Sequence, residues 1–184
     1  KVPTDSEVLF VSNHRSNFDP MVQWWVLRRW PLAFVSKPSN MRKFVIGPFV
    51  RRCCFLPIDR ENARNALTTI NAAANLIRTH VCSFAIYPEG TRSKSAELLP
   101  WHAGSLKIAQ KAGCPIVPVS ICGTDNIMEA NKHNFIRSHK VVIEFLDPID
   151  INGMKPKERK EVLDTIPELI QEARVKNLPL ATKK

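Results

Sequence analysis

Short apolar runs alternate with longer amphipathic segments along most of the chain. Compact runs rich in branched and aromatic side chains are typical of buried strands. They predict strands at 8–11, 32–35, 83–87, 116–121 and 141–146. A further strand is expected within 44–58, which is apolar and is interrupted by proline and glycine.

Helical periodicity or end signals predict helices over 19–29, 61–79, 103–112 and 156–176. Asp19 before Pro20 is typical of an N-cap followed by proline at the first helical position. Gly113 is a typical stop for the third helix. Pro167 must kink the last helix or start a new one, because proline lacks an N–H and clashes with the preceding turn.

Strands that alternate with helices over short connections predict an α/β fold. We therefore expect a single layered domain with a largely parallel, possibly mixed, sheet flanked by helices. A length of 184 residues fits one domain over 1–184 with a full hydrophobic core. No internal repeat, low-complexity tract or linker divides it.

The chain begins with Lys1, and a strand is predicted within a few residues, so we expect residues to be missing upstream. A bilayer-spanning helix needs about 20 consecutive apolar residues. The best candidate for such a span, 21–35, is interrupted by Arg28 and Arg29. No membrane-spanning helix and no signal peptide is therefore predicted within the chain.

The net charge of +10 favours anionic partners, which are nucleic acid, anionic lipid head groups or phosphorylated substrates. No nucleic-acid-binding motif accompanies the charge, so nucleic acid is not an expected partner. The five cysteines are an odd number without C-x-x-C spacing. This usage predicts buried, reduced thiols in a domain that faces the cytosol, without a zinc site or a disulfide framework.

A polar cluster with chemical potential follows the first predicted strand, in the sequence Asn13-His14-Arg15-Ser16-Asn17-Phe18-Asp19. His14 and Asp19 would point apart on a helix or on a strand, so they can meet only across a tight turn. A carboxylate on one imidazole nitrogen fixes the tautomer and supports the imidazolium that forms when the other nitrogen takes a proton. Two structural roles remain open, because Asp19 could be only a helix cap and His14 only a hydrogen-bonded turn residue.

A second cluster, Tyr87-Pro88-Glu89-Gly90-Thr91-Arg92-Ser93, follows another predicted strand. Gly90 permits an unusual backbone conformation or a close approach to a ligand. Arg92 offers planar, bidentate donors to a phosphate, and Glu89 could hold that arginine or a substrate hydroxyl. The alternative is a solvated turn with an arginine–glutamate pair, which contributes little stability.

With these two clusters, the chain resembles the glycerolipid acyltransferase family, and the resemblance covers residues from about 10 to 122. Asn13-His14-x-Ser16-x-x-Asp19 matches the family's first motif, and Glu89-Gly90-Thr91-Arg92 matches its third. Leu56-Pro57-Ile58-Asp59-Arg60 is similar to the end of the second motif, with Gly47 at its start, and Val117-Pro118-Val119 is similar to the fourth. The third motif is most like that of enzymes that acylate 1-acylglycerol-3-phosphate. Trp101-His102 departs from the basic or aromatic pair that many relatives carry there, which leaves local substrate contacts open.

The resemblance implies that His14 is a general base that Asp19 orients. His14 would deprotonate a glycerol hydroxyl, which attacks the thioester carbonyl of acyl-CoA or acyl carrier protein. Arg60 and Arg92 would hold the acceptor phosphate, with Glu89, Gly90 and Thr91 on the same substrate-binding turn. Lys37 is a further candidate for the phosphate, or else a solvated lysine. No metal and no cofactor beyond the acyl thioester co-substrate is expected.

Trp24, Trp25, Arg28, Arg29 and Trp30 crowd one predicted helix and its exit. Tryptophan and arginine together suit the lipid head-group region, and the segments 41–44 and 49–52 repeat the apolar and basic character. We expect a membrane-associated domain that faces the cytoplasm and contacts anionic lipid. The alternative is that the tryptophans belong to the core and the arginines to a solvated face. Family members commonly carry a hydrophobic N-terminal segment before the first motif, which would be among the missing upstream residues.

Three functions remain open from the sequence. The first is acylation of the sn-2 hydroxyl of 1-acylglycerol-3-phosphate to give phosphatidic acid in phospholipid biosynthesis. The second is acylation of glycerol-3-phosphate or another lysophospholipid. The third, of a different class, is a non-catalytic module that binds anionic lipid through its basic face.

Overall fold

A computed structural model describes residues 2–41, 50, 55–59, 62–95, 97–102 and 104–182. The strands are β1 (Leu9–Ser12), β2 (Leu32–Ser36), β3 (Leu56–Pro57), β4 (Ser83–Ile86), β5 (Ile116–Cys122) and β6 (Val142–Phe145). The α-helices are α1 (Asp19–Val26), α2 (Pro38–Met41), α4 (Ala63–Arg78), α5 (Lys107–Ala112) and α6 (Pro156–Thr182). Two short 3-10 helices, η1 (Asp125–Ile127) and η2 (Lys132–Asn134), lie between β5 and β6.

The strands form one mixed sheet in the order β3-β2-β4-β1-β5-β6. β1 pairs in parallel with β4 and with β5, and β2 pairs in parallel with β3 and with β4. Only β6, which pairs with β5, runs antiparallel among these strands. The predicted α/β fold with a largely parallel sheet is confirmed. The parallel arrangement places the carboxyl ends of β1 to β5 at one edge of the sheet, where α/β proteins bind their ligands.

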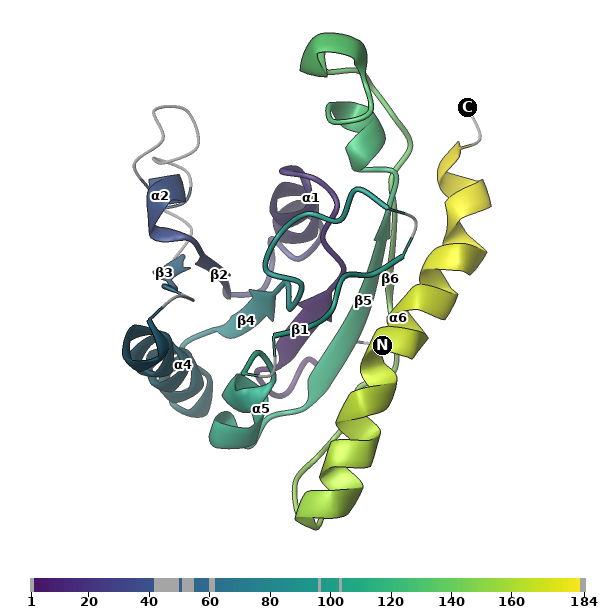
Figure 1. Cartoon of the computed structure of the whole chain (residues 1–184). Coiled ribbons are helices and arrows are strands. Elements are labelled where there is room, and N and C mark those ends of the chain that lie inside the picture. The colour runs from purple at the N-terminus through teal and green to yellow at the C-terminus, as the bar shows by residue number, and fades with distance from the viewer. Residues whose placement is uncertain are drawn as a thin grey trace.

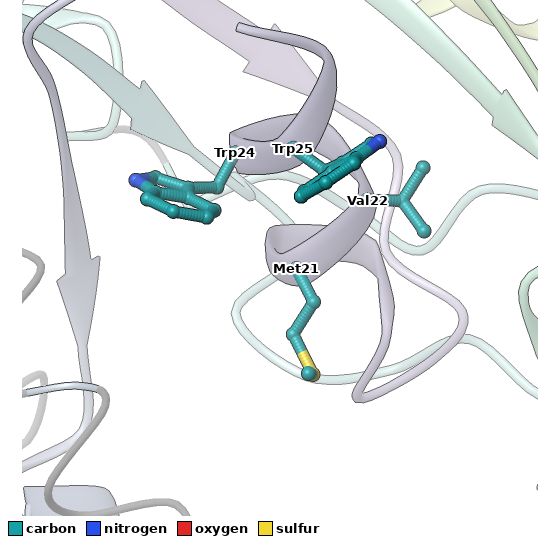
Figure 2. A pocket seen from close by; sticks show the side chains of 4 residues that line it. All are labelled: Met21, Val22, Trp24 and Trp25. Atoms are coloured by element: carbon teal, nitrogen blue, oxygen red, sulfur yellow. The ribbon is translucent and has the colours of Figure 1, made fainter. Parts of the chain in front are cut away.

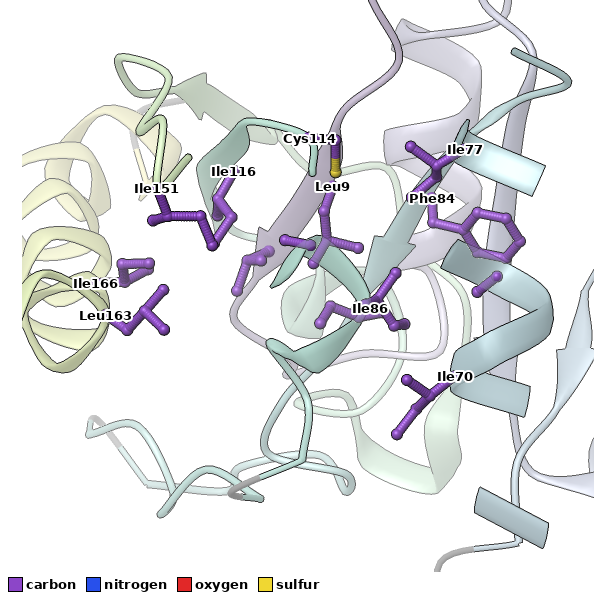
Figure 3. Close-up of a cluster of buried hydrophobic side chains, with 14 of the residues drawn as sticks. Leu9, Ile70, Ile77, Phe84, Ile86, Cys114, Ile116, Ile151, Leu163 and Ile166 are labelled. Carbon is purple, nitrogen blue, oxygen red and sulfur yellow. The ribbon is translucent and has the colours of Figure 1, made fainter. Parts of the chain in front are cut away.

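Helices cover both faces of the sheet (Figure 1). On one face, α4, α5 and α6 bury side chains such as Ile70, Ile108 and Ile166 against Leu9 and Ile116 of the strands (Figure 3). On the other face, Trp24 of α1 and Leu27, which follows this helix, pack in a second cluster. The cluster includes Phe10, Phe34 and Val117 of the strands. The central strands are apolar on both faces for this reason, and they read as continuous runs.

The first helix differs from its prediction at both ends. Asp19 is the first helical residue and Phe18 is the N-cap, and the helix ends at Val26 instead of Arg29. Asp19 is not the cap because its carboxylate accepts the N–H groups of Arg15 and Ser16, which precede the helix. The same contacts turn the chain sharply enough to bring His14 back to the start of α1.

The last helix runs through Pro167 and continues to Thr182, so the proline does not start a new helix. A proline within a helix loses one backbone hydrogen bond and strains the preceding turn. Here the buried face of α6 offsets that cost, because Leu163, Ile166 and Ile170 are packed on both sides of the proline.

Cys82, Cys114 and Cys122 are buried and carry free thiols, as the sequence predicts. Burial raises the pKa of the Cys114 thiol to about 12 and also raises the pKa of Cys122. Cys53 and Cys54 lie outside the described residues. None of the helices that the structure describes is long and apolar enough to cross a bilayer.

Candidate active site

The site lies at the carboxyl edge of the sheet, where polar residues follow three of the parallel strands. His14 follows β1, the Glu89–Arg92 turn follows β4, and Lys37 follows β2. β1 and β4 are neighbours in the sheet, although 75 residues separate His14 from Glu89. The topology therefore brings the two predicted clusters together.

His14 and Asp19 meet across the turn, as their spacing requires. Nδ1 of His14 lies 2.8 Å from Oδ2 of Asp19. The imidazole is partly exposed, with 19% of its side chain accessible, whereas the carboxylate is fully buried. Among the described residues, Nε2 of His14 has no hydrogen-bond partner. With Nδ1 held by the carboxylate as a donor, Nε2 carries the lone pair and can accept a proton from a ligand.

Asp19 is held by more than the imidazole. Its Oδ2 also accepts the N–H of Arg15 at 2.7 Å and that of Ser16 at 2.8 Å. Its Oδ1 accepts the hydroxyl of Thr124, which follows β5, at 2.5 Å. These donors replace the water that a carboxylate loses on burial. Asp19 therefore has a fixed orientation and a negative charge to offer to His14.

The ring of Tyr87 stacks on the imidazole of His14, with 4.5 Å between the ring centroids. Tyr87 directly follows β4, and its hydroxyl donates to Oε1 of the buried Gln23 at 2.9 Å. Burial raises the pKa of Tyr87 well above its ordinary value, and the nearby Asp19 charge raises it further. The phenol is therefore neutral at physiological pH. It packs against His14 and does not exchange protons with it.

Glu89 has a different partner from the one that the sequence allowed. Its Oε1 accepts the N–H of His14 at 2.7 Å and its Oε2 accepts the N–H of Leu99 at 2.9 Å. The carboxylate thus joins two loop backbones and does not hold Arg92. Burial raises the pKa of Glu89, and the N–H groups of Leu99 and His14 oppose that rise. Only 3% of the residue is exposed, which leaves little of Glu89 for contact with a substrate. Its substrate-binding role stays a prediction.

The rest of the turn reaches the surface. Gly90 has φ of 71°, the left-handed conformation that glycine adopts without strain. Thr91 and Arg92 are exposed, and the N–H of Ser93 donates to the carbonyl of His14 at 2.8 Å. Arg92 pairs with Glu129, with Nη1 3.0 Å from Oε1.

The two remaining predicted phosphate ligands are Lys37 and Arg60. Lys37 is exposed at the carboxyl edge, directly after β2. Arg60 lies outside the described residues, two positions beyond Ile58. The N–H of Ile58 donates to the carbonyl of Ser36 and so extends the β2–β3 pairing.

Asn13, from the first motif, links β1 to β5 at this edge, because its side-chain amide exchanges two hydrogen bonds with the backbone of Ile121. No group of three His, Cys, Asp or Glu side chains that could hold a metal ion occurs in the described ranges.

Sequence reasoning missed a third segment, which follows β5. Thr124 binds Asp19, Asp125 forms a two-pronged ion pair with Arg15, and Glu129 binds Arg92. The segment's place directly after a predicted strand was the available signal, because all parallel strands end at this edge. Arg174 of α6 was also missed. It is 5% exposed. Burial and the nearby charge of Arg15 lower its pKa, and the charges of Glu89 and Asp125 oppose that shift.

Comparisons with known proteins agree with this geometry. A family model described as Acyltransferase matches residues 1–122. The chain is 33% identical over 154 residues to the 1-acyl-sn-glycerol-3-phosphate acyltransferase of Salmonella typhimurium, covering 82% of this chain and 61% of that relative. It is 34% identical over 155 residues to the protein of that name from Escherichia coli K12, with 82% and 61% covered.

A solved structure is also similar. The 1-acyl-sn-glycerophosphate (LPA) acyltransferase PlsC from Thermotoga maritima superposes with a TM-score of 0.71 at 27% sequence identity. The match covers 94% of this chain and 68% of that one. The chain thus spans about three fifths of the length of the curated bacterial relatives, at 61%.

Proposed function

The chain belongs to the acyltransferase family, and we propose that it acylates the sn-2 hydroxyl of 1-acylglycerol-3-phosphate with an acyl thioester. The product would be phosphatidic acid, a phospholipid precursor. One observation carries the proposal: His14 is fixed through Nδ1 by a buried carboxylate, while Nε2 is left for a substrate. The names of the bacterial relatives and of the Thermotoga maritima structure support the choice of acceptor.

The chemistry follows from that geometry. Nε2 of His14 removes the proton of the acceptor hydroxyl as its oxygen attacks the thioester carbonyl. The tetrahedral intermediate collapses, the carbon–sulfur bond breaks, and the thiolate of CoA or acyl carrier protein takes the proton from His14. Asp19 stabilises the imidazolium that exists between the two proton transfers. A thioester is activated enough that no covalent acyl-enzyme is needed.

A panel of acceptors tests the function. The full-length protein is given a radiolabelled acyl-CoA and, in turn, 1-acylglycerol-3-phosphate, glycerol-3-phosphate and lysophosphatidylcholine. We expect kcat/KM to be highest for 1-acylglycerol-3-phosphate. Faster acylation of glycerol-3-phosphate would support the second acceptor instead. Absence of transfer to every acceptor, with retained vesicle binding, would support the non-catalytic lipid-binding module.

Arg92 is the described residue best placed to hold the acceptor phosphate. It is exposed at the carboxyl edge, and a guanidinium can bind two phosphate oxygens at once. Arg60 and Lys37 remain proposed partners in that task. Glu89 and Gly90 would shape the turn, and Thr91 would lie beside the substrate.

Arg92→Lys is expected to raise KM for 1-acylglycerol-3-phosphate about tenfold, with a smaller change in kcat. Lysine keeps the charge but loses the bidentate geometry, which acts in ground-state and transition-state binding alike. Steady-state kinetics with each substrate varied in turn measures the effect. A change confined to the KM of the acyl donor would contradict the phosphate assignment.

We also propose that the domain works at a membrane surface on the cytoplasmic side. Met21, Val22, Trp24 and Trp25 line an open apolar groove of about 300 Å³ on α1 (Figure 2). Trp24 packs partly on the core, whereas Trp25 is 62% exposed and carries the guanidinium of Arg28 over its ring at 4.8 Å. The segments 41–44 and 49–52 lie almost wholly outside the described residues.

The segment between β5 and β6 also supports the proposed contact with a membrane. It extends beyond the carboxyl edge of the sheet (Figure 1) and exposes 64% of Phe135 and 70% of Ile136. Lys132, Arg137 and Lys140 flank these side chains, and no acidic residue occurs between Ala130 and Ile143. Apolar side chains within a basic segment suit insertion into an anionic head-group layer.

Replacing Phe135 and Ile136 together with serine is expected to weaken binding to phosphatidylglycerol-containing vesicles about tenfold or more, because less apolar area enters the lipid. Co-sedimentation of the 184-residue chain with vesicles measures the effect. The matched control is Val81→Ser, since Val81 is 53% exposed but precedes β4 at the opposite edge. Equal loss in both variants, or no loss in either, would rule out this segment as the contact.

A further inference from the structure

Three hydrogen-bond donors from the two motif turns converge on one carboxylate. Oε1 of Glu129 accepts from Nη1 of Arg92 at 3.0 Å and from the N–H of Asn17 at 2.8 Å. Its Oε2 accepts from the hydroxyl of Ser16 at 2.7 Å. Glu129 itself belongs to neither motif, because it lies after β5 in the segment that joins η1 to η2.

A guanidinium, a backbone N–H and a hydroxyl around one anion are the donors that a phosphate monoester needs. The position is adjacent to the catalytic pair, because the N–H of Ser16 binds the same Asp19 oxygen that holds His14. It is also open to solvent, since 42% of the Arg92 side chain is exposed. The carboxylate therefore occupies a place where the phosphate of an acceptor would bring its hydroxyl within reach of His14.

We propose that Glu129 is an internal placeholder that occupies the acceptor-phosphate position and is displaced when the acceptor binds. This inference rests on the proposed function. A phosphate monoester carries up to two charges and three acceptor oxygens, so it can replace a carboxylate on these donors. An uncharged or zwitterionic head group cannot do so as well. Glu129 thereby lowers the affinity for every acceptor and selects for those with a terminal phosphate.

The backbone around Glu129 is held by contacts that do not involve its side chain. The N–H of Ala130 donates to the carbonyl of Asp125 at 2.9 Å. The side-chain amide of Asn131 donates to the carbonyls of Asn126 and Ile127 at 2.9 and 3.0 Å. Asp125 is fixed in turn by the guanidinium of Arg15. The Glu129 side chain can therefore leave Arg92 while the segment stays in place.

Glu129→Gln tests the proposal, because it removes the negative charge that faces Arg92 and keeps the size of the side chain. The amide oxygen can still accept from the N–H of Asn17, and the amide nitrogen can donate to the hydroxyl of Ser16. Titration calorimetry of the full-length protein with sn-glycerol 3-phosphate and with inorganic phosphate gives the affinities. We expect Glu129→Gln to bind both probes about three- to tenfold more tightly, since the competing charge is absent. KM for 1-acylglycerol-3-phosphate should fall by a similar factor. The preference over lysophosphatidylcholine should shrink.

A double-mutant cycle distinguishes the placeholder role of Glu129 from a purely structural role in linking the loops. In an Arg92→Met background, Glu129→Gln should no longer change phosphate affinity, because the shared partner is gone. Weaker or unchanged phosphate binding by Glu129→Gln, in a variant that melts at the wild-type temperature, would overturn the inference. If the variant melts early, the same comparison with Glu129→Ala decides, since alanine also removes the charge.

The proposed function fails in a distinguishable way. A wild-type protein that acylates 1-acylglycerol-3-phosphate, with no gain in phosphate affinity in Glu129→Gln, refutes the placeholder alone. A wild-type protein that neither binds the phosphate probes nor transfers an acyl group refutes both.

Discussion

His14→Ala is expected to lower kcat/KM for acyl transfer by about 10³-fold or more, because general-base catalysis contributes about 10²–10⁴-fold in enzymes. Nε2 is the nitrogen that is left for a substrate, since Nδ1 is bonded to Asp19. Alanine leaves the hydroxyl of the acceptor with water as its only base. Vesicle binding and the melting temperature should change little, because the imidazole lies at the site's surface and the backbone bonds of His14 to Glu89 and Ser93 remain.

A histidine outside the site provides the control. His80 lies before β4 at the opposite edge of the sheet and pairs with Glu7. His80 has φ of 55°, so asparagine is the suitable replacement, because it tolerates the left-handed region. His80→Asn should retain full transfer. Undiminished transfer by His14→Ala would refute the mechanism.

The sequence predicted the contact between His14 and Asp19 because it is local. Five residues separate the two side chains, and only a turn can join them at that spacing. The family resemblance then linked this turn to the one that contains Arg92. Both turns follow strands, and parallel strands end at a common edge, so their meeting could also be expected once the sheet was predicted.

The contacts that complete the site could not be predicted, because they depend on strand order. Thr124 reaches Asp19 across 105 residues, since β5 and β1 are neighbours in the sheet. Nothing in the local sequence around Thr124 specifies that neighbour. The same is true of Glu129. Its partner Ser16 lies in the loop after β1, and its partner Arg92 lies in the loop after β4. For Glu89, the residue type is compatible with a substrate contact and with a structural role. In the fold the side chain is buried, and its two oxygens accept the backbone N–H groups of His14 and Leu99.

Helix ends were predicted less well than helix positions. The end of α1 at Val26 leaves Arg28 and Arg29 beyond the helix, although arginine is a good helix former. The continuation of α6 through Pro167 depends on its packing against the sheet, which no local signal contains. For α6, tertiary contacts therefore override the helix-breaking propensity of proline.

Asp19→Asn is expected to lower kcat about 10²-fold while the fold remains intact, a smaller loss than that from His14→Ala. Oδ2 accepts two backbone N–H groups besides the imidazole, so an asparagine side chain must place its oxygen there. Its amide nitrogen then faces Thr124, whose hydroxyl can turn to accept a hydrogen bond. The imidazole keeps the same tautomer and loses only the negative charge that stabilises the imidazolium.

The Asp19→Asn variant separates two roles that Asp19 could have. If Asp19 only orients the ring, Asp19→Asn should retain nearly full activity, because the orienting oxygen is preserved. If it also stabilises charge, kcat falls while KM for both substrates stays within about threefold. Asp125→Asn is the matched control, since Asp125 is a neighbouring carboxylate that binds Arg15 and does not contact the imidazole. A loss in Asp125→Asn as large as that in Asp19→Asn would assign the effect to the local field of the loop, and the carboxylate on Nδ1 would then be no more than an orienting group.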